Sequence, residues 1–296
     1  MALDLRPLSS NLGVEVLGVE LSRPVSDETL ADLRRAHAEH GLLLFRDQQL
    51  TPDQQVAFSR RWGELEVHVL KEFTLPDHPE VFVLTNAKEG GRAKGAHKVG
   101  WHWHIDNTYM QNSSLGSLLY AHEVPPEGGD TLFSSLTAAY GALSDETKAR
   151  IDGLKTIHSY QYMWPIKYPE KPPLSAEQKA RVPDLEHPLV RVHPETGRKV
   201  LYVSEYIIKQ VVGWSIEESQ SLFAELVAHA TRDAFVYRHK WRPGDLLFWD
   251  NRGTMHLATP YDDEKYKRLM HTTRIKTEAF KGRATGPAPA EPVPVH

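Results

Sequence analysis

Residues 101–106 (WHWHID) place two metal-ligating residue types at alternating positions. In a β-strand, side chains point alternately to the two faces, so His102, His104 and Asp106 would share one face. An imidazole and a carboxylate two residues apart can occupy neighbouring positions around one metal ion. A lone H-x-D pair is more often a surface pair, so its meaning depends on the rest of the chain.

A second histidine-containing segment lies much later in the chain. Residues 244–256 (GDLLFWDNRGTMH) run from an apolar strand pattern through a turn-forming Asp-Asn pair to His256. One more histidine would complete the 2-His-1-carboxylate set of non-haem Fe(II) oxygenases, which leaves one face of the metal open for reactants. The chain has no cysteine, so any metal must be held by histidine and carboxylate.

Three motifs in this order resemble the taurine dioxygenase family, which includes the phenoxyacetate-herbicide dioxygenases. They are W-H-x-D at 103–106, G-G-D-T at 128–131 and W-D-N-R-x-x-x-H at 249–256, and the resemblance extends over about 13–276. It implies His104, Asp106 and His256 as metal ligands, with Fe(II), 2-oxoglutarate and O2 as cofactor and co-substrates. It also implies a mostly β fold with flanking helices, a distorted double-stranded β-helix of the cupin-like jelly-roll type.

The distal carboxylate of 2-oxoglutarate requires a guanidinium on a rigid strand. In 268–274 (RLMHTTR) alternate positions share a face, so Arg268 and Arg274 both point inward if the strand is regular. Family members usually carry arginine after Met-His, where this chain has Thr272. We therefore expect Arg274 to be the main contact and Arg268 its support, while Thr131 matches a family threonine that hydrogen-bonds the co-substrate.

The resemblance implies hydroxylation of a small anionic organic molecule (a sulfonate, aryloxyalkanoate, amino acid or other carboxylate) with release of succinate and CO2. His68 matches a substrate-contacting histidine of the taurine enzymes. Other candidates follow only from their proximity to the motifs; they are Lys71, His102, Trp101, Tyr109 and Tyr206, with Tyr162, Trp164 and Lys167 in an expected lid.

Several elements must position these residues. A helix is expected at 27–40 between the Ser26 cap and Gly41, then a strand at 42–45 and a helix from Pro52 with Thr51 as N-cap. Further expected helices are 136–154 and 215–231; further strands are 81–84, 236–239, 245–249 and 268–276. Residues 162–187 read as a long loop, a common form of substrate lid.

Composition limits the remaining possibilities. The chain has 296 residues and a net charge of −4, with no basic stripe for nucleic acid and no membrane-spanning apolar run. We expect one catalytic domain over 1–281, a tail without regular structure over 282–296, and a cytoplasmic location. The family resemblance is compatible with a homo-oligomer.

Two other function classes share the histidine cluster. A non-catalytic metal-binding jelly-roll protein would have no reason to place arginines on its last strand. A zinc hydrolase would need a general base near the ligands, for which Glu123 is the candidate. Metal-dependent oxygen consumption separates these alternatives from a dioxygenase.

Overall fold

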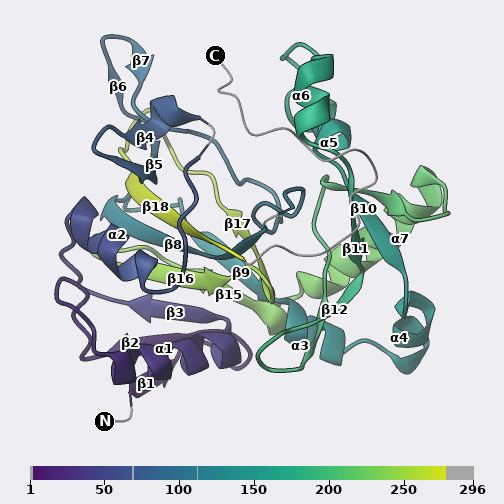
Figure 1. Ribbon diagram of the computed structural model, residues 1–296, viewed down its shortest axis with the longest axis horizontal. Helices are drawn as coiled ribbons and strands as arrows, with labels where there is room; N and C mark the ends of the chain where they lie inside the picture. Colours follow the sequence, from purple (N-terminus) through teal and green to yellow (C-terminus); the bar gives the residue numbers. More distant parts are fainter. Residues whose placement is uncertain (1–2, 69, 112, 278–296) are drawn as a thin grey trace.

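An eight-stranded sheet forms the larger half of the computed structural model, which describes residues 3–68, 70–111 and 113–277 (Figure 1). Only the β2–β3 pair is parallel among its pairings. In spatial order its strands are β1 (Asp4–Pro7), β2 (Val14–Leu17), β3 (Leu42–Phe45), β16 (Leu246–Asp250), β8 (Ser114–Glu123), β18 (Leu269–Lys276), β5 (His78–Thr85) and β4 (Thr74–Leu75). The expected tail 282–296 lies outside the described residues.

A smaller antiparallel sheet packs against this large sheet. It consists of β15 (Val236–His239), β9 (Thr131–Ser135) and β17 (Thr254–Ala258) in that order. One buried cluster joins the two sheets, because Phe133 of β9 packs with Leu119 of β8, Leu247 of β16 and Met270 of β18. Buried apolar area of this kind is the main stabilising contribution in such layered folds.

The helices lie mainly at the two ends of the molecule (Figure 1). Helix α1 (Asp27–His40) is capped by Ser26 and ends at Gly41, whose φ of 69° is left-handed, and α2 (Pro52–Arg60) begins at Thr51 with a capping box. These two predicted helices are confirmed. Short elements between α2 and β8 are η1 (Lys71–Phe73), β6 (Lys88–Glu89) and β7 (Arg92–Ala93).

The other end holds a three-stranded sheet, β11 (Leu185–Pro188), β10 (Lys155–His158) and β14 (Ile208–Val211), and the hairpin β12 (Val190–Val192) with β13 (Lys199–Leu201). Helix α7 (Ile216–Ala230) packs against β14, and η2 (Asp233–Phe235) follows it. No helix in the described ranges is both long and apolar enough to cross a membrane.

Two sequence predictions about this end are wrong. The expected helix 136–154 is two helices, α3 (Leu136–Gly141) and α4 (Asp145–Ile151), because the Ser144 hydroxyl accepts from Thr147 N and starts a new helix. The expected loop 162–187 instead includes most of α5 (Tyr160–Lys167), all of α6 (Ala176–Arg181) and all but the last residue of β11. Serine caps at Ser159 and Ser175 begin these two helices.

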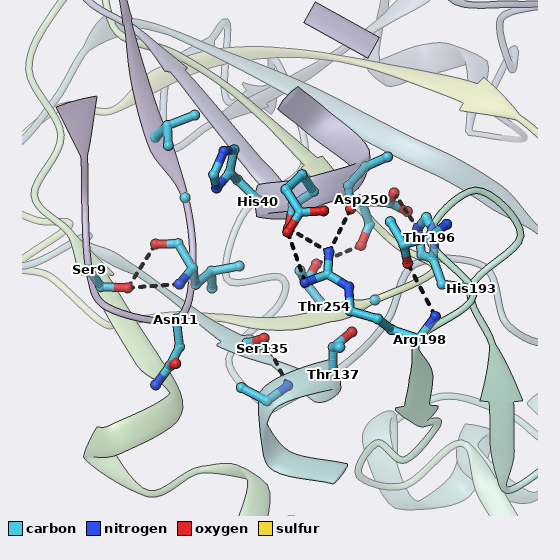
Figure 2. A pocket seen from close by; sticks show the side chains of 18 of the residues that line it. Ser9, Asn11, His40, Ser135, Thr137, His193, Thr196, Arg198, Asp250 and Thr254 are labelled. Atoms are coloured by element: carbon cyan, nitrogen blue, oxygen red, sulfur yellow. Dashed lines mark hydrogen bonds and ion pairs between the residues drawn. The ribbon is translucent and has the colours of Figure 1, made fainter. Parts of the chain in front are cut away.

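A buried charge cluster fixes the turn after β16. Asp250 accepts hydrogen bonds from Arg252 Nη2 at 2.6 Å and from His193 Nε2 at 3.0 Å. Burial would raise the pKa of Asp250, but these bonds and the nearby positive charge hold it below its usual range. Asp250 also borders a cavity of about 400 Å³ between the β1–β2 connection, the end of α1 and the His193 turn (Figure 2).

We expect Asp250→Ala to lower the free energy of unfolding by about 3–5 kcal/mol, because it leaves His193 buried without its acceptor and Arg252 with only Glu195 as a partner. Because the pKa of Asp250 is lower in the folded protein, this contribution to stability is fully present above the ordinary pKa of 3.8. It is lost as the pH falls from 3.8 through the lower pKa of the folded state. Urea unfolding measures both effects, with the exposed Asp77→Ala as control. Equal midpoints for the two variants would contradict the assignment.

Candidate metal centre

His104 and His256 lie side by side although they are far apart in the chain. His256 belongs to β17, and His104 forms an isolated antiparallel bridge with it. The backbone N–H of each donates to the carbonyl of the other, at 3.0 Å and 2.8 Å, and the two rings are 4.1 Å apart. The expected strand over 101–106 is therefore wrong, since only this bridge forms, but the bridge itself brings the two imidazoles together.

The side chains of His104, Asp106 and His256 converge. Nε2 of His104 lies 3.8 Å from Asp106 Oδ1, and Nε2 of His256 lies 4.0 Å from Asp106 Oδ2. The three potential donor atoms all lie within 4.8 Å of one another. On the far side of its ring, His104 Nδ1 is 2.8 Å from the His102 carbonyl oxygen, which orients Nε2 toward the centre. Two imidazoles and one carboxylate in this arrangement fit a divalent metal ion.

The protonation states favour metal binding. Burial lowers the pKa of His104, and burial together with the repulsion that a protonated His104 would exert lowers the pKa of His256 to about 3. Burial would raise the pKa of Asp106. The positive charge of Arg274 is the largest of the opposing effects, which together hold this pKa below its usual range. The centre therefore presents neutral imidazoles and a carboxylate, the forms that bind metal ions.

A network behind Asp106 fixes its carboxylate. Ser117 Oγ donates to Asp106 Oδ2 at 2.7 Å, and Asn251 Nδ2 donates to Ser117 Oγ at 3.1 Å. Arg274 Nε lies 3.8 Å from the same carboxylate oxygen. Ser117 was not predicted from the sequence, although Asn251 in the W-D-N-R motif was a signal that the motif supports the site as well as supplying a ligand.

The chain turns sharply after Asp106. Asn107 has a φ of 56°, in the left-handed region that asparagine tolerates better than most residues, and its Nδ2 donates to Glu66 Oε2 at 2.6 Å. Burial raises the pKa of Glu66, while the positive charge of Arg274 opposes that shift. Arg274 is thus flanked by two carboxyl groups, Asp106 and Glu66, and Glu66 was not predicted from the sequence.

Arg268 has a different environment from Arg274. It precedes β18, and the register of β18 against β8 shifts between Leu269 and Met270, so the two arginines are not related by simple alternation. Its buried guanidinium has no carboxylate within 4.0 Å in the described ranges, and burial lowers its pKa to about 10. Tyr261 is the ionisable residue whose charge opposes this lowering of the Arg268 pKa.

The G-G-D-T segment lies near the same end of the site. At Gly128 (φ 72°) a Cβ would be 2.6 Å from the Pro260 carbonyl oxygen and 3.1 Å from Tyr261 Cα, so the close approach requires glycine. Thr131 then lies opposite Ala258, two residues after His256. Its hydroxyl accepts from Trp241 Nε1 at 2.9 Å, which leaves the hydroxyl proton available for a ligand.

The predicted substrate contacts are distributed unevenly. His68 stacks on Phe82 with ring centroids 4.0 Å apart, and burial together with the charge of Arg274 lowers its pKa to about 3. Arg274 also lies over the Phe82 ring, at 6.0 Å. Lys71 is exposed on η1. His68 is therefore close to Arg274 and the centre, and Lys71 is a surface residue next to that region.

On the other side of the centre, the His102 ring lies 4.8 Å from that of His104 and 5.6 Å from that of Tyr206. Tyr206 is 46% exposed and has a φ of 63°, a strained conformation for an aromatic residue. Tyr109 packs on Tyr160 of α5 at 4.7 Å. Burial raises the pKa of Tyr109, so its hydroxyl stays protonated.

The cavity shown in Figure 2 is separate from this centre. Two charged residues that line it are already paired within the protein: Asp250 with Arg252 and His193, and Arg198, whose Nη2 donates to the Glu39 carbonyl at 2.6 Å near the end of α1. None of the residues that line it was predicted as a site residue. We therefore assign no binding role to this cavity.

Comparison with known proteins identifies the family. The model of the family "Taurine catabolism dioxygenase TauD, TfdA family" matches residues 4–274. An (S)-phenoxypropionate/alpha-ketoglutarate-dioxygenase of Sphingobium herbicidovorans is 34% identical, over 93% of this chain and 95% of its own length. An alpha-ketoglutarate-dependent sulfate ester dioxygenase of Pseudomonas putida is 32% identical, over 87% and 84%.

Solved structures agree with this result. A taurine dioxygenase from Burkholderia xenovorans is 34% identical, with a TM-score of 0.81 over 98% of this chain and 96% of that chain. The enzyme AAD-2, crystallised with Mn(II) and N-oxalylglycine, is 30% identical, with a TM-score of 0.77 over 96% and 98%. The chain therefore belongs to the TauD, TfdA family and is a 2-oxoglutarate-dependent dioxygenase.

Proposed function

We propose that His104, Asp106 and His256 hold Fe(II) and that the enzyme hydroxylates a small organic anion. The observation that carries this proposal is the convergence of two imidazole Nε2 atoms on one buried carboxylate. When bound, Fe(II) would supply the activation of O2 that couples oxidation of 2-oxoglutarate to succinate and CO2 with oxidation of the substrate. The protein holds the reactants in place and excludes water.

Within the same proposal, Arg268 and Thr131 bind the distal carboxylate of 2-oxoglutarate. Arg268 is a buried cation without a carboxylate partner among the described residues, and Thr131 has a hydroxyl proton to donate. Arg274 already faces Asp106 and Glu66. This order is the reverse of the one expected from the sequence, where Arg274 was the main contact. Arg274 would instead orient Asp106 and stabilise its negative charge.

The substrate class follows from the relatives, which are named for phenoxypropionate, 2,4-dichlorophenoxyacetate and sulfate esters. These compounds share an anionic group on an apolar body. We therefore place the substrate of this chain among organic carboxylates, sulfonates and sulfate esters.

We further propose that residues 1–281 form one catalytic domain and that its core is a distorted double-stranded β-helix. The support is the shared buried cluster between the eight-stranded sheet and the β15–β9–β17 sheet. The cytoplasmic location and the homo-oligomer stay predictions.

Glu123, the general base expected for the hydrolase alternative, lies far from the centre. Glu123 is exposed at the end of β8, six residues from Ser117, which bonds Asp106. At about 3.3 Å per residue this places Glu123 roughly 20 Å along the strand from the centre. The family match favours the dioxygenase over a non-catalytic jelly-roll protein.

The direct test is succinate formation from 2-oxoglutarate by the protein with Fe(II) and ascorbate. We expect an aryloxyalkanoate, alkyl sulfate and sulfonate panel to stimulate succinate formation, and a chelator to abolish it. Oxygen consumption measured in parallel should depend on both the metal and 2-oxoglutarate. Metal-dependent hydrolysis of an ester without oxygen consumption would overturn the proposal.

A further inference from the structure

His187 is a buried histidine that hydrogen-bonds to the chain just after a metal ligand. Its Nε2 lies 2.7 Å from the carbonyl oxygen of Thr108, and both residues are buried although they are 79 positions apart in the chain. A carbonyl oxygen can only accept a hydrogen bond, so Nε2 carries the proton and donates it. Because Thr108 is two residues after Asp106, this bond connects a distant strand to the backbone that carries the ligand.

The imidazole of His187 is held in one orientation. His187 belongs to β11, where its backbone carbonyl accepts from Thr156 Oγ1 at 3.2 Å. Its ring lies at 69° to that of His158, with centroids 4.5 Å apart, and at 62° to that of Tyr202, with centroids 5.6 Å apart. Burial lowers the pKa of His187 to about 4, so near pH 7 the ring is neutral and has one proton to donate. His187 is therefore a fixed donor directed at Thr108.

The turn that receives this bond has an uncommon backbone conformation. In this Asp106 turn, residues 106–110, Asn107 has a left-handed φ of 56°, and Met110 N donates to the Asn107 carbonyl at 2.9 Å. A residue other than glycine keeps such a conformation where the surrounding structure holds it. Loss of the bond from His187 would leave the buried Thr108 carbonyl without that donor, and the turn would lose a contact to its backbone.

His187 also belongs to a longer segment whose two ends both contact the Asp106 turn. This segment, residues 160–187, contains α5 and α6. Tyr160 at its start packs on Tyr109 with ring centroids 4.7 Å apart, and His187 at its end bonds to Thr108. Since Ser117 of β8 bonds the Asp106 carboxylate, the side chain of this ligand and the backbone after it are held by different elements.

We propose that His187 is a positioning residue for the metal centre: its hydrogen bond to Thr108 holds the Asp106 turn so that the carboxylate meets the two imidazoles. The proposal rests on the proposed Fe(II) site and deepens it. The centre then requires the donor at Nε2 rather than the bulk of the ring. A replacement that keeps a donor at that position retains metal affinity, and a replacement that cannot reach Thr108 does not.

The test compares two amides at position 187. The amide nitrogen of glutamine is separated from Cα by as many bonds as Nε2 of histidine, whereas that of asparagine is one bond closer to Cα. We expect His187→Asn to weaken Mn(II) binding about 2- to 10-fold, the equivalent of one neutral hydrogen bond, and His187→Gln to bind Mn(II) as the wild type does. Electron paramagnetic resonance of free Mn(II) gives the affinities, and urea unfolding shows which variants are folded. His187→Leu, which has no donor, should show the same loss and decides the test if His187→Asn does not fold.

His158→Asn is the matched control, because His158 is also buried, lies on the neighbouring strand β10 and packs on the same Tyr202 ring, with centroids 5.5 Å apart. Its two ring nitrogens have no hydrogen-bond partner within the described ranges, so the change removes packing but no bond to the turn. It should keep the Mn(II) affinity of the wild type even if its unfolding midpoint falls.

Three results would overturn the positioning role. They are wild-type Mn(II) affinity in the variants without a donor, an equal loss in His187→Gln and His187→Asn, and an equal loss in His158→Asn. Failure of the wild type itself to bind Mn(II) would overturn the proposed metal centre, and this proposal with it. The wild-type titration therefore separates a failed role for His187 from a failed metal site.

Discussion

Replacing His256 by alanine should reduce metal-dependent succinate formation by more than about 100-fold, since even loss of a residue behind a metal ligand costs 10- to 100-fold. His256 contributes one of only three donors that converge in the centre, and its Nε2 lies 4.0 Å from Asp106 Oδ2. His104→Ala and Asp106→Ala should have effects of the same size. Mn(II) affinity, measured by electron paramagnetic resonance, should fall in parallel with activity.

His122→Ala is a suitable control for these variants. His122 is also a half-buried histidine, but it lies on β8, and its Nε2 is 2.9 Å from Nδ1 of His271 rather than facing the centre. It should retain the Mn(II) affinity of the wild type. Unchanged Mn(II) binding in the His256 variant would show that the three donors do not act as one site.

Local signals in the sequence predicted local structure well. Helix α1 begins and ends where Ser26 and Gly41 predict, because a cap depends on only a few neighbouring atoms. The same principle explains the failure at 136–154. The apolar spacing indicated one helix, but Ser144 offers a second cap, and the chain uses it to start α4. Periodicity did not reveal which of two compatible arrangements packs better.

The candidate site depended more on contacts between distant residues. The motifs suggested His104, Asp106 and His256, but the strand alternation used for 101–106 does not occur, and the His104–His256 bridge across the chain aligns the two rings instead. The parts played by Glu66 and Ser117 could not be inferred, because each depends on which residues lie nearby in space. The arginines show the same limit, since one register shift beside Met270 separates Arg268 from the alternation that includes Arg274.

The charge balance around the two arginines predicts different defects. Arg274 is compensated by Asp106 and Glu66, so removing it leaves two neighbouring carboxyl groups without their cation. Asp106 would then bind a proton more readily, and the metal site would lose affinity. Arg268 has no such carboxylate in the described ranges. Its removal therefore eliminates the free-energy cost of burying a cation when no ligand is bound, but it weakens the binding of an anion.

Arg268→Ala should therefore raise the KM for 2-oxoglutarate about 10- to 100-fold, as expected for loss of a hydrogen bond to a charged group, with Mn(II) affinity unchanged. Arg268→Lys should recover part of the loss, because an ammonium keeps the charge but lacks the planar fork. Arg274→Ala should mainly weaken Mn(II) binding. Titration of N-oxalylglycine into the Mn(II)-loaded variants separates the two roles. A larger loss of N-oxalylglycine affinity in Arg274→Ala, at saturating Mn(II), would restore the order expected from the sequence and assign the distal carboxylate to Arg274.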